Sequence, residues 1–362
     1  GLRGERVAPR SRRRALCLIH TNKLGTVMSK QRGTSGMNQN EKPPADRSAL
    51  AGPDDLAGGH ETGKLPARLE RYGSGRARGL QMLSHLRTDH HDQQKAIGRL
   101  RDCGDYLVFH DYYTVGESRL VGANFCMQHL ICPLCAMRRG AKYVENYMAR
   151  LGVILKDRPD LRLFMVTYTV RNGDDLEERF QHLRRSLSRL HEKRRNYLKH
   201  GWGRTELANV EGAVWSFETT NKGKGWHPHV HCIYLAPSAP SQTALRAEWE
   251  KITEDSHQVD VRPIQGEPAD GFVEVFKYAM KFSELSLADN VTAWQTFKGR
   301  RLVASFGLFR GVKVPEKLED DPLDSLPYVE RFYRYLPGSG YNLHACREHS
   351  PEDDQKAQAA DE

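Results

Sequence analysis

The chain has 362 residues, a formal net charge of +9 and a mean hydropathy of −0.67, and this length suits about two domains. The positive charge is concentrated at the start, because residues 1–40 carry nine Lys or Arg and a single Glu. No apolar run approaches the ~20 residues of a membrane span, and residues 15–19 are too few for the core of a signal peptide. Seven cysteines, an odd number, without an export signal favour a reducing cytoplasm over a disulfide framework.

Both ends of the chain have the composition of polar tails. Residues 1–80 are rich in Gly, Arg, Pro, Ser and Ala without sustained periodicity, which predicts a disordered basic N-terminal tail over residues 1–94. Ordered structure is expected to begin near residue 94, where an apolar helical pattern starts. Residues 316–362 are predicted to be an acidic, partly disordered C-terminal extension that contains a short helix at 328–335.

The middle of the chain, residues 141–315, alternates between strand-like and helix-like patterns. The expected elements are, in chain order, a strand at 163–170, a helix from 176, strands at 213–220 and 229–235, a helix at 244–254, a strand at 259–264 and a helix at 272–282. Helices laid on hairpin-linked strands predict an α+β fold, an antiparallel sheet with helices packed on it, rather than a doubly wound sheet.

A cysteine motif precedes this region: residues 126–135 read Cys-x2-His-x2-Cys-x2-Cys. Zinc favours four thiolate or imidazole ligands, and a Cys-x2-Cys turn brings two sulfurs to one ion. We therefore predict a zinc-binding module at 95–140 that holds a structural Zn²⁺, with unliganded core cysteines as the alternative. The ligands are expected to be four of five residues: Cys126, Cys132, Cys135, and either Cys103 or His129. Arg138 and Arg139 follow directly and are expected to present charge to a phosphate backbone.

Two histidines in the strand-like run at 229–235 form the second motif. Because side chains alternate along a strand, His229 and His231 project from the same face. Glu218 lies opposite them if residues 221–225 form a hairpin turn. Two imidazoles and a carboxylate make a natural divalent-metal site, although this donor set also suits zinc.

The third motif is the segment Glu-Val-Phe-Lys-Tyr-Ala-Met-Lys at 274–281. On a helix Glu274, Tyr278 and Lys281 share one stripe. A tyrosine hydroxyl is a competent nucleophile toward phosphorus once its charge is stabilised, which a metal or an ammonium group can do. The alternative is an ordinary amphipathic helix with a Glu–Lys pair.

Together these motifs resemble the HUH endonucleases and, more closely, the replication initiator proteins of rolling-circle plasmids. The shared pattern is Cys-x5-Cys-Pro-x-Cys with Arg-Arg, then Trp-His-Pro-His-x-His, then Glu-x-x-Lys-Tyr-x-x-Lys. A segment at 297–309 also matches the end of that family. The resemblance covers roughly residues 95–312 and includes neither tail.

The resemblance implies an HUH nicking endonuclease domain at 141–315, in which His229, His231 and Glu218 hold Mg²⁺ or Mn²⁺. Tyr278 would attack the scissile phosphodiester and leave a 5′-phosphotyrosyl link and a free 3′-hydroxyl primer. Glu274 would activate water for the terminating cut, and Lys281 and Lys277 would steady the phosphate or the phenolate.

The implied substrate is plasmid origin DNA that is single-stranded at the nick. Host helicase and polymerase are the implied partners, dimerisation on DNA is left open, and a plasmid-encoded protein of the bacterial cytoplasm with no membrane partner is expected. The basic face of the helix from 176 is the candidate for backbone contact, with a solvated face as the alternative. The residues of this face expected to bind DNA are Arg184, Arg185, Arg189, Lys193, Arg194 and Arg195.

Three other functions remain open from the sequence. A mobilisation relaxase commonly carries its tyrosine ahead of the histidines, whereas Tyr278 follows them. A single-tyrosine transposase is usually shorter and lacks the cysteine motif. A zinc-dependent DNA-binding regulator without catalysis is the alternative from a different class.

Overall fold

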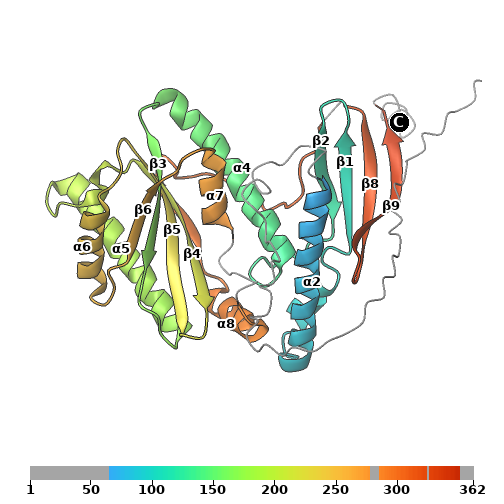
Figure 1. Cartoon of the computed structure of the whole chain (residues 1–362), viewed down its shortest axis with the longest axis horizontal. Helices are drawn as coiled ribbons and strands as arrows, with labels where there is room; N and C mark the ends of the chain where they lie inside the picture. Colours follow the sequence, from blue (N-terminus) through green and yellow to red (C-terminus); the bar gives the residue numbers. More distant parts are fainter. Residues whose placement is uncertain (1–64, 278–284, 324–325, 351–362) are drawn as a thin grey trace, which may run out of the picture. The chain divides into compact units, whose positions relative to one another are not determined.

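The computed structural model describes residues 65–277, 285–323 and 326–350, all within one compact unit, Ser48–Glu362. These residues form two antiparallel sheets with helices packed on them (Figure 1), so the predicted α+β class is confirmed. The sequence predicts one sheet, and the second is built from segments assigned above to the zinc module and the C-terminal extension. No helix in the described part of the chain combines the length and apolar character needed to span a membrane.

The larger sheet has the strand order β6-β3-β5-β4-β7, and all its neighbouring strands are antiparallel. Its strands are β3 (Arg162–Thr169), β4 (Gly212–Asn221), β5 (Trp226–Ala236), β6 (Val259–Pro263) and β7 (Val303–Gly307). The accompanying helices are α4 (Pro133–Asp157), α5 (Leu176–His200), η2 (Glu206–Asn209), α6 (Gln242–Thr253), α7 (Pro268–Phe276) and α8 (Leu287–Phe297). The elements predicted between residues 163 and 264 are all present, with ends shifted by three residues or fewer.

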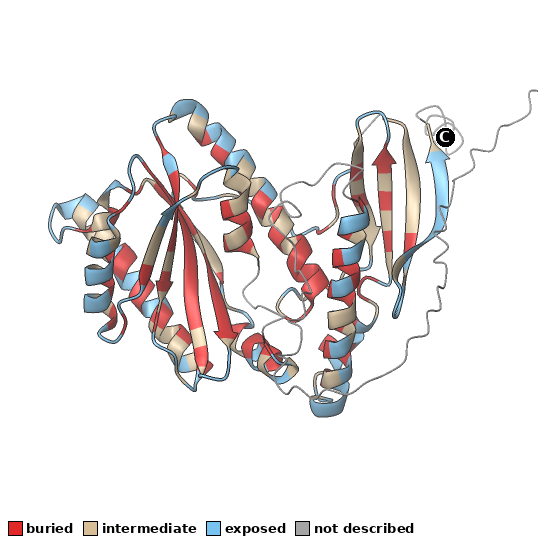
Figure 2. Ribbon diagram, viewed as in Figure 1, coloured by how far each residue is buried: buried red, intermediate tan, exposed pale blue. Residues whose placement is uncertain are grey.

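Helices cover both faces of the larger sheet, which is why its central strands are mostly buried (Figure 2). Val166 and Val230 share one face and pack with Phe180 of α5, in a cluster that also includes Trp249 of α6. The side chains of alternate residues, such as Ile233, point to the opposite face and pack with α4 and α7. The sheet therefore has an α5/α6 face and an α4/α7 face.

The smaller sheet has the order β2-β1-β8-β9. Its strands are β1 (Tyr106–Tyr112), β2 (Glu117–Ala123), β8 (Tyr328–Leu336) and β9 (Gly340–His349), and the helices before it are α2 (Leu65–Asp89) and α3 (Gln94–Arg101). The prediction of a helix at 328–335 is wrong, because this segment pairs along β1 and forms β8. The sequence of this segment is compatible with either a helix or a strand, and its pairing with β1, more than 200 residues away in the sequence, makes it a strand.

The prediction that residues 1–94 form a tail is wrong for residues 65–89, which form α2. The arginines of α2 make its sequence look like that of a solvent-exposed segment, but Arg68 and Arg76 are themselves buried. The guanidinium of Arg68 donates to the carbonyl of Ser118 at 2.8 Å, and that of Arg76 donates to the carbonyl of Leu100 at 2.9 Å. An arginine-rich composition therefore does not mean a solvated segment here.

A buried carboxylate, Asp320, connects several of these elements. Its oxygens accept hydrogen bonds from Arg138 of α4 at 2.6 Å and from the backbone of Leu120 in β2 at 2.9 Å, and they lie within 3.4 Å of Arg68 and Lys142. Burial alone would raise the pKa of Asp320, but the surrounding cations outweigh burial and hold it well below its usual range. Asp320 is thus the shared anion of a cluster of buried cations.

Substitution Asp320→Ala should therefore destabilise the fold by about 3–5 kcal/mol, because it leaves buried cations uncompensated. Urea unfolding at pH 7 measures this loss, and Asp321→Ala, at an exposed neighbour that pairs with the exposed Lys317, should change little. Since the folded-state pKa of Asp320 is lowered, its stabilisation is complete above the ordinary carboxyl pKa of about 4 and is lost as the pH falls below it. Equal stabilities of the two variants would contradict this role.

Candidate metal centre and cysteine cluster

The pairing of β4 with β5 brings Glu218 and the two histidines of the sequence motif together. Glu218 lies opposite His229, and Ser216 lies opposite His231, so all four side chains share the α4/α7 face of the sheet. Residues 222–225 connect the two strands, as expected from the glycines in this segment. The predicted position of Glu218 opposite the histidine pair is therefore confirmed.

The three side chains converge on one point. The carboxylate oxygens of Glu218 lie 3.4 Å from Nε2 of His229 and 3.3 Å from Nε2 of His231. One ligand atom from each residue lies within 4.8 Å of the others, and the side chains are only 4%, 10% and 11% exposed. Two nitrogens and a carboxylate at this separation are a donor set that fits a divalent cation.

Neighbouring groups orient both imidazoles. Nδ1 of His229 lies 3.3 Å from the carbonyl oxygen of His227, which can only accept, so this nitrogen carries the proton. Nδ1 of His231 lies 3.0 Å from the hydroxyl of Thr167 on β3. These contacts direct Nε2 of each ring toward Glu218, as outer-sphere partners of metal-binding histidines do. Sequence reasoning did not select Thr167 as a site residue, because its place beside His231 depends on strand register.

The electrostatics of Glu218 are consistent with such a site. Burial by itself would raise the pKa of its carboxyl, but the adjacent imidazoles of His229 and His231 outweigh burial and hold this pKa well below the usual range. Glu218 is therefore an anion at neutral pH. A buried anion between two imidazoles attracts a cation.

The end of α7 lies close to this centre. Glu274 is half-buried and pairs with Lys277, whose ammonium lies 2.7 Å from Oε2. Burial would raise the pKa of Glu274, but Lys277 and, more weakly, His231 outweigh it, while Glu218 acts in the opposite sense. The carboxylate therefore lies within electrostatic reach of the metal centre. Tyr278 and Lys281 lie outside the described residues, and the helical stripe predicted through them stays a prediction.

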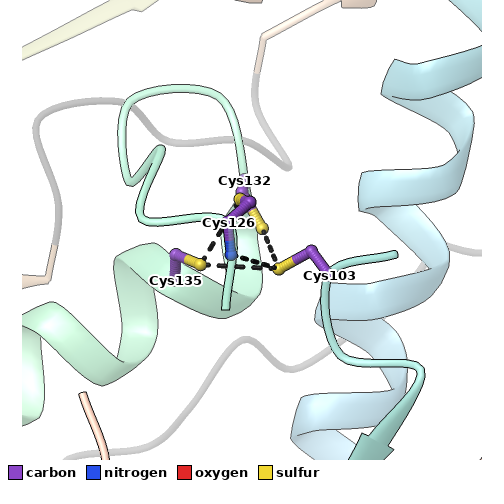
Figure 3. Close-up of side chains that lie close together, drawn as sticks. All are labelled: Cys103, Cys126, Cys132 and Cys135. Carbon is purple, nitrogen blue, oxygen red and sulfur yellow. Dashed lines mark hydrogen bonds between the residues drawn. The ribbon is translucent and has the colours of Figure 1, made fainter. Parts of the chain in front are cut away.

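Four cysteine side chains meet at the start of α4 (Figure 3). Sγ of Cys103 lies 3.5 Å from Sγ of Cys132 and of Cys135, and Sγ of Cys126 also lies 3.5 Å from that of Cys135. Hydrogen bonds with the neighbouring thiols, chiefly Cys103, lower the pKa of Cys126. His129, the other candidate for the fourth ligand, is exposed and is not part of this cluster. Four buried sulfurs at this spacing fit the tetrahedral coordination of zinc.

Several basic residues predicted to contact DNA have structural contacts instead. Arg138 is buried and binds Asp320 and the carbonyl of Leu318, so its assignment to a phosphate backbone is wrong. Arg194 is half-buried, donates to the carbonyls of Leu207 and Val210 and lies over the ring of Phe306, and its predicted contact with DNA stays a prediction. Lys193 forms an ion pair with Glu248 at 3.0 Å. The exposed members of the predicted set are Arg184, Arg185, Arg189 and Arg195.

Arg139 is half-buried, with its guanidinium 4.9 Å from the centre of the Tyr143 ring. It also donates to the carbonyl of Pro315. This arginine faces the α4/α7 side of the larger sheet, next to a cavity that also contacts Ser216 of β4. Its predicted contact with a phosphate backbone stays a prediction.

Comparison with known proteins points to one family. The profile of a family described as replication protein matches residues 117–333, more than half of the chain. A relative from Streptococcus pneumoniae serotype 2 (strain D39), described as Protein rep, is 28% identical over 258 residues, which cover 66% of this chain and 77% of the relative. No solved structure matches the chain. The family match includes both the candidate metal centre and all the clustered cysteines except Cys103.

The geometry of the centre makes a prediction about metal binding. Glu218→Gln should weaken Mn²⁺ binding by about tenfold or more, because it removes the only anion of the donor set. Thr167→Val should weaken it by about tenfold through loss of imidazole orientation. Calorimetric titration with Mn²⁺ measures both effects, and Glu250→Ala, at an exposed carboxylate of α6, serves as the control. Unchanged affinity in Glu218→Gln would contradict the assigned centre.

Proposed function

The chain belongs to the replication protein family, and we propose that it initiates rolling-circle replication of a plasmid by nicking one strand at the origin. The observation that carries this proposal is the convergence of Glu218, His229 and His231 on the sheet face that α7 covers. Tyr278 follows the last described residue of that region, Lys277, directly in the sequence. The order of these motifs is that of an HUH endonuclease, which supports the same activity.

The nick is a transesterification. A divalent cation bound at the centre, Mg²⁺ or Mn²⁺, would polarise the scissile phosphodiester and stabilise charge on phosphorus. The phenolic oxygen of Tyr278 bonds to phosphorus as the bond from phosphorus to the 3′ oxygen breaks, and the phenolic proton passes to water. The 3′ oxygen takes up a proton, so the products are a 5′-phosphotyrosyl link and a free 3′-hydroxyl. Because the phosphoester is conserved, rejoining needs no ATP.

Residues around the tyrosine have supporting roles. Lys277 and Lys281 steady the phosphate or the phenolate by charge. Glu274 activates water for the terminating cut, and its lowered pKa keeps it ionised at neutral pH, as a general base must be. The ion pair between Lys277 and Glu274 holds both charged groups at the end of α7.

The substrate is single-stranded at the nick. A metal centre recessed on a sheet face, with all three ligands buried or nearly so, cannot reach a phosphodiester inside a regular duplex. The exposed arginines of α5 are proposed to contact the DNA backbone elsewhere, without reading sequence. A host helicase then unwinds the duplex, and a host polymerase extends the 3′-hydroxyl.

The nucleophile can be tested directly. Full-length protein is incubated with Mn²⁺ and single-stranded oligonucleotides tiled over the plasmid that encodes it, and covalent adducts are resolved on a denaturing gel. Tyr278→Phe should lose the adduct entirely because it removes the attacking oxygen, whereas Tyr113→Phe, at an exposed tyrosine between β1 and β2, should retain it. An adduct in Tyr278→Phe would reject this nucleophile, and no adduct with any metal would favour a non-catalytic DNA-binding regulator.

We also propose that the four clustered cysteines hold a structural Zn²⁺. Glu218→Gln is used as the background, because the histidine centre has donors that zinc accepts as well. In it, Cys103→Ser should lose most of the bound zinc and lower the midpoint of thermal unfolding, since four thiolates are needed to complete the site. Elemental analysis of the purified chain measures the zinc content.

Two control variants define the ligand set. His129→Ala removes the other candidate for the fourth ligand, and Cys346→Ser removes an exposed cysteine outside the cluster. Both should keep one zinc per chain. Loss of zinc from His129→Ala with full zinc in Cys103→Ser would reverse the assignment.

A further inference from the structure

A cavity of about 720 Å³ lies beside the candidate metal centre. Its walls include Ser216 of β4, Val303 of β7, Gly140 and Tyr143 of α4, and Phe276 at the end of α7. Ser216 is the cross-strand neighbour of His231, and Val303 is the neighbour of Ser216 on the other side. The cavity therefore lies on the α4/α7 face and borders β4, the strand that also carries Glu218.

The charge around this cavity is of one sign. The charged and imidazole side chains that line it, among the described residues, are Arg139, Arg300, Arg301, Arg310 and His129, with no Asp or Glu. Arg300 is neutralised by Glu177 at 2.7 Å. Arg301 and Arg310 are exposed, and neither forms an ion pair with any residue that the structure describes. Two arginines are thus available to bind an anion at the rim.

The inner wall is apolar and aromatic. The rings of Tyr143 and Phe276 stack with their centres 5.0 Å apart, and Val303 and Val312 lie on the adjoining walls. An apolar, aromatic wall together with exposed arginines suits a ligand that has both a base and a phosphate, which describes an unpaired nucleotide. The cavity volume lies within the range of pockets that hold ligands of this size.

We propose that this cavity binds an unpaired nucleotide of the nicked strand, next to the scissile phosphate. Arg301 and Arg310 bind the backbone phosphate, and the base lies against the wall formed by Tyr143 and Phe276. The identity of the strand rests on the proposed nicking function, but the binding step needs neither a metal nor a cut. A nucleotide held there would place the neighbouring phosphate beside His231.

Binding is measured first, by fluorescence anisotropy of a single-stranded oligonucleotide that contains the nick site, in EDTA so that no cut occurs. The double variant Arg301→Ala/Arg310→Ala should bind about tenfold more weakly. Its slope of log affinity against log salt should be shallower by about 0.7, since the two arginines neutralise one phosphate and each single-strand phosphate contributes about 0.7. Lysine at both positions should restore most of the affinity, because it keeps the charge.

The matched control is Arg162→Ala. Arg162 is also exposed, but it lies at the start of β3, opposite Ala236. His229 pairs with Thr169 at the other end of this strand, so Arg162 is far from the candidate metal ligands. This variant should bind like the wild type. An equal loss in Arg162→Ala would mean a general charge effect and would overturn the assignment to the cavity.

Two further experiments show where the oligonucleotide binds and whether the ligand is a strand or a free nucleotide. An oligonucleotide with 5-iodouracil beside the nick site should cross-link to the peptide that contains Tyr143, and a cross-link confined to α5 would overturn the proposal. A competing deoxynucleoside monophosphate should displace the oligonucleotide only weakly. Equal affinity for both would assign the cavity to a free nucleotide and would also overturn it.

Failure of this inference is distinguishable from failure of the proposed function. If the wild type forms a covalent adduct and the double variant binds and reacts equally well, the cavity proposal is wrong and nicking stands. If no adduct forms under any condition but the double variant still loses single-strand binding, the cavity proposal stands as a binding site and nicking is wrong.

Discussion

The candidate active site depends on the register of β4 against β5. Because side chains alternate along a strand, a slip of one residue would send His229 and His231 to the α5/α6 face and away from Glu218. The connection at 222–225 fixes that register. Gly225 is needed there, since its backbone has a φ of +81° and a Cβ would lie 2.8 Å from the carbonyl oxygen of Gly173.

Helix α4 links the cysteine cluster to this site. Its first turn contributes Cys135 to the cluster, and the next turn contributes Arg138 to the Asp320 ion network. Gly140 then lets α7 approach, because a Cβ at this position would lie 2.6 Å from the carbonyl oxygen of Phe276. Any change that shifts the start of α4 therefore also shifts the segment that leads to Tyr278, so a metal at the cysteines would stabilise the site without taking part in chemistry.

Sequence patterns predicted the part of the fold in which local periodicity agrees with tertiary packing. The strands β3, β4 and β5 and the helices α5 and α6 have clear patterns, and the alternation in β5 also predicted which histidines share a face. The elements that were missed depend on distant partners. β8 forms by pairing with β1, and α2 is buried through arginines whose acceptors lie elsewhere in the chain. Neither the pairing of β8 with β1 nor the burial of the α2 arginines can be recognised from the neighbouring residues in the sequence.

The local sequence also does not predict which arginines are neutralised in the folded protein. Arg138 and Arg139 are adjacent in the sequence, yet Arg138 is neutralised by Asp320, 182 residues away, whereas Arg139 lines the cavity with Arg301 and Arg310. Which arginines remain available is therefore set by tertiary structure and not by runs of like charge. Among the residues that the structure describes, exposed arginines lie on α5 and at the cavity, and of these two groups the cavity shares its face with the candidate metal centre. On the proposed function, the strand to be cut would pass along the α4/α7 face, and contacts made by α5 would involve DNA away from the nick.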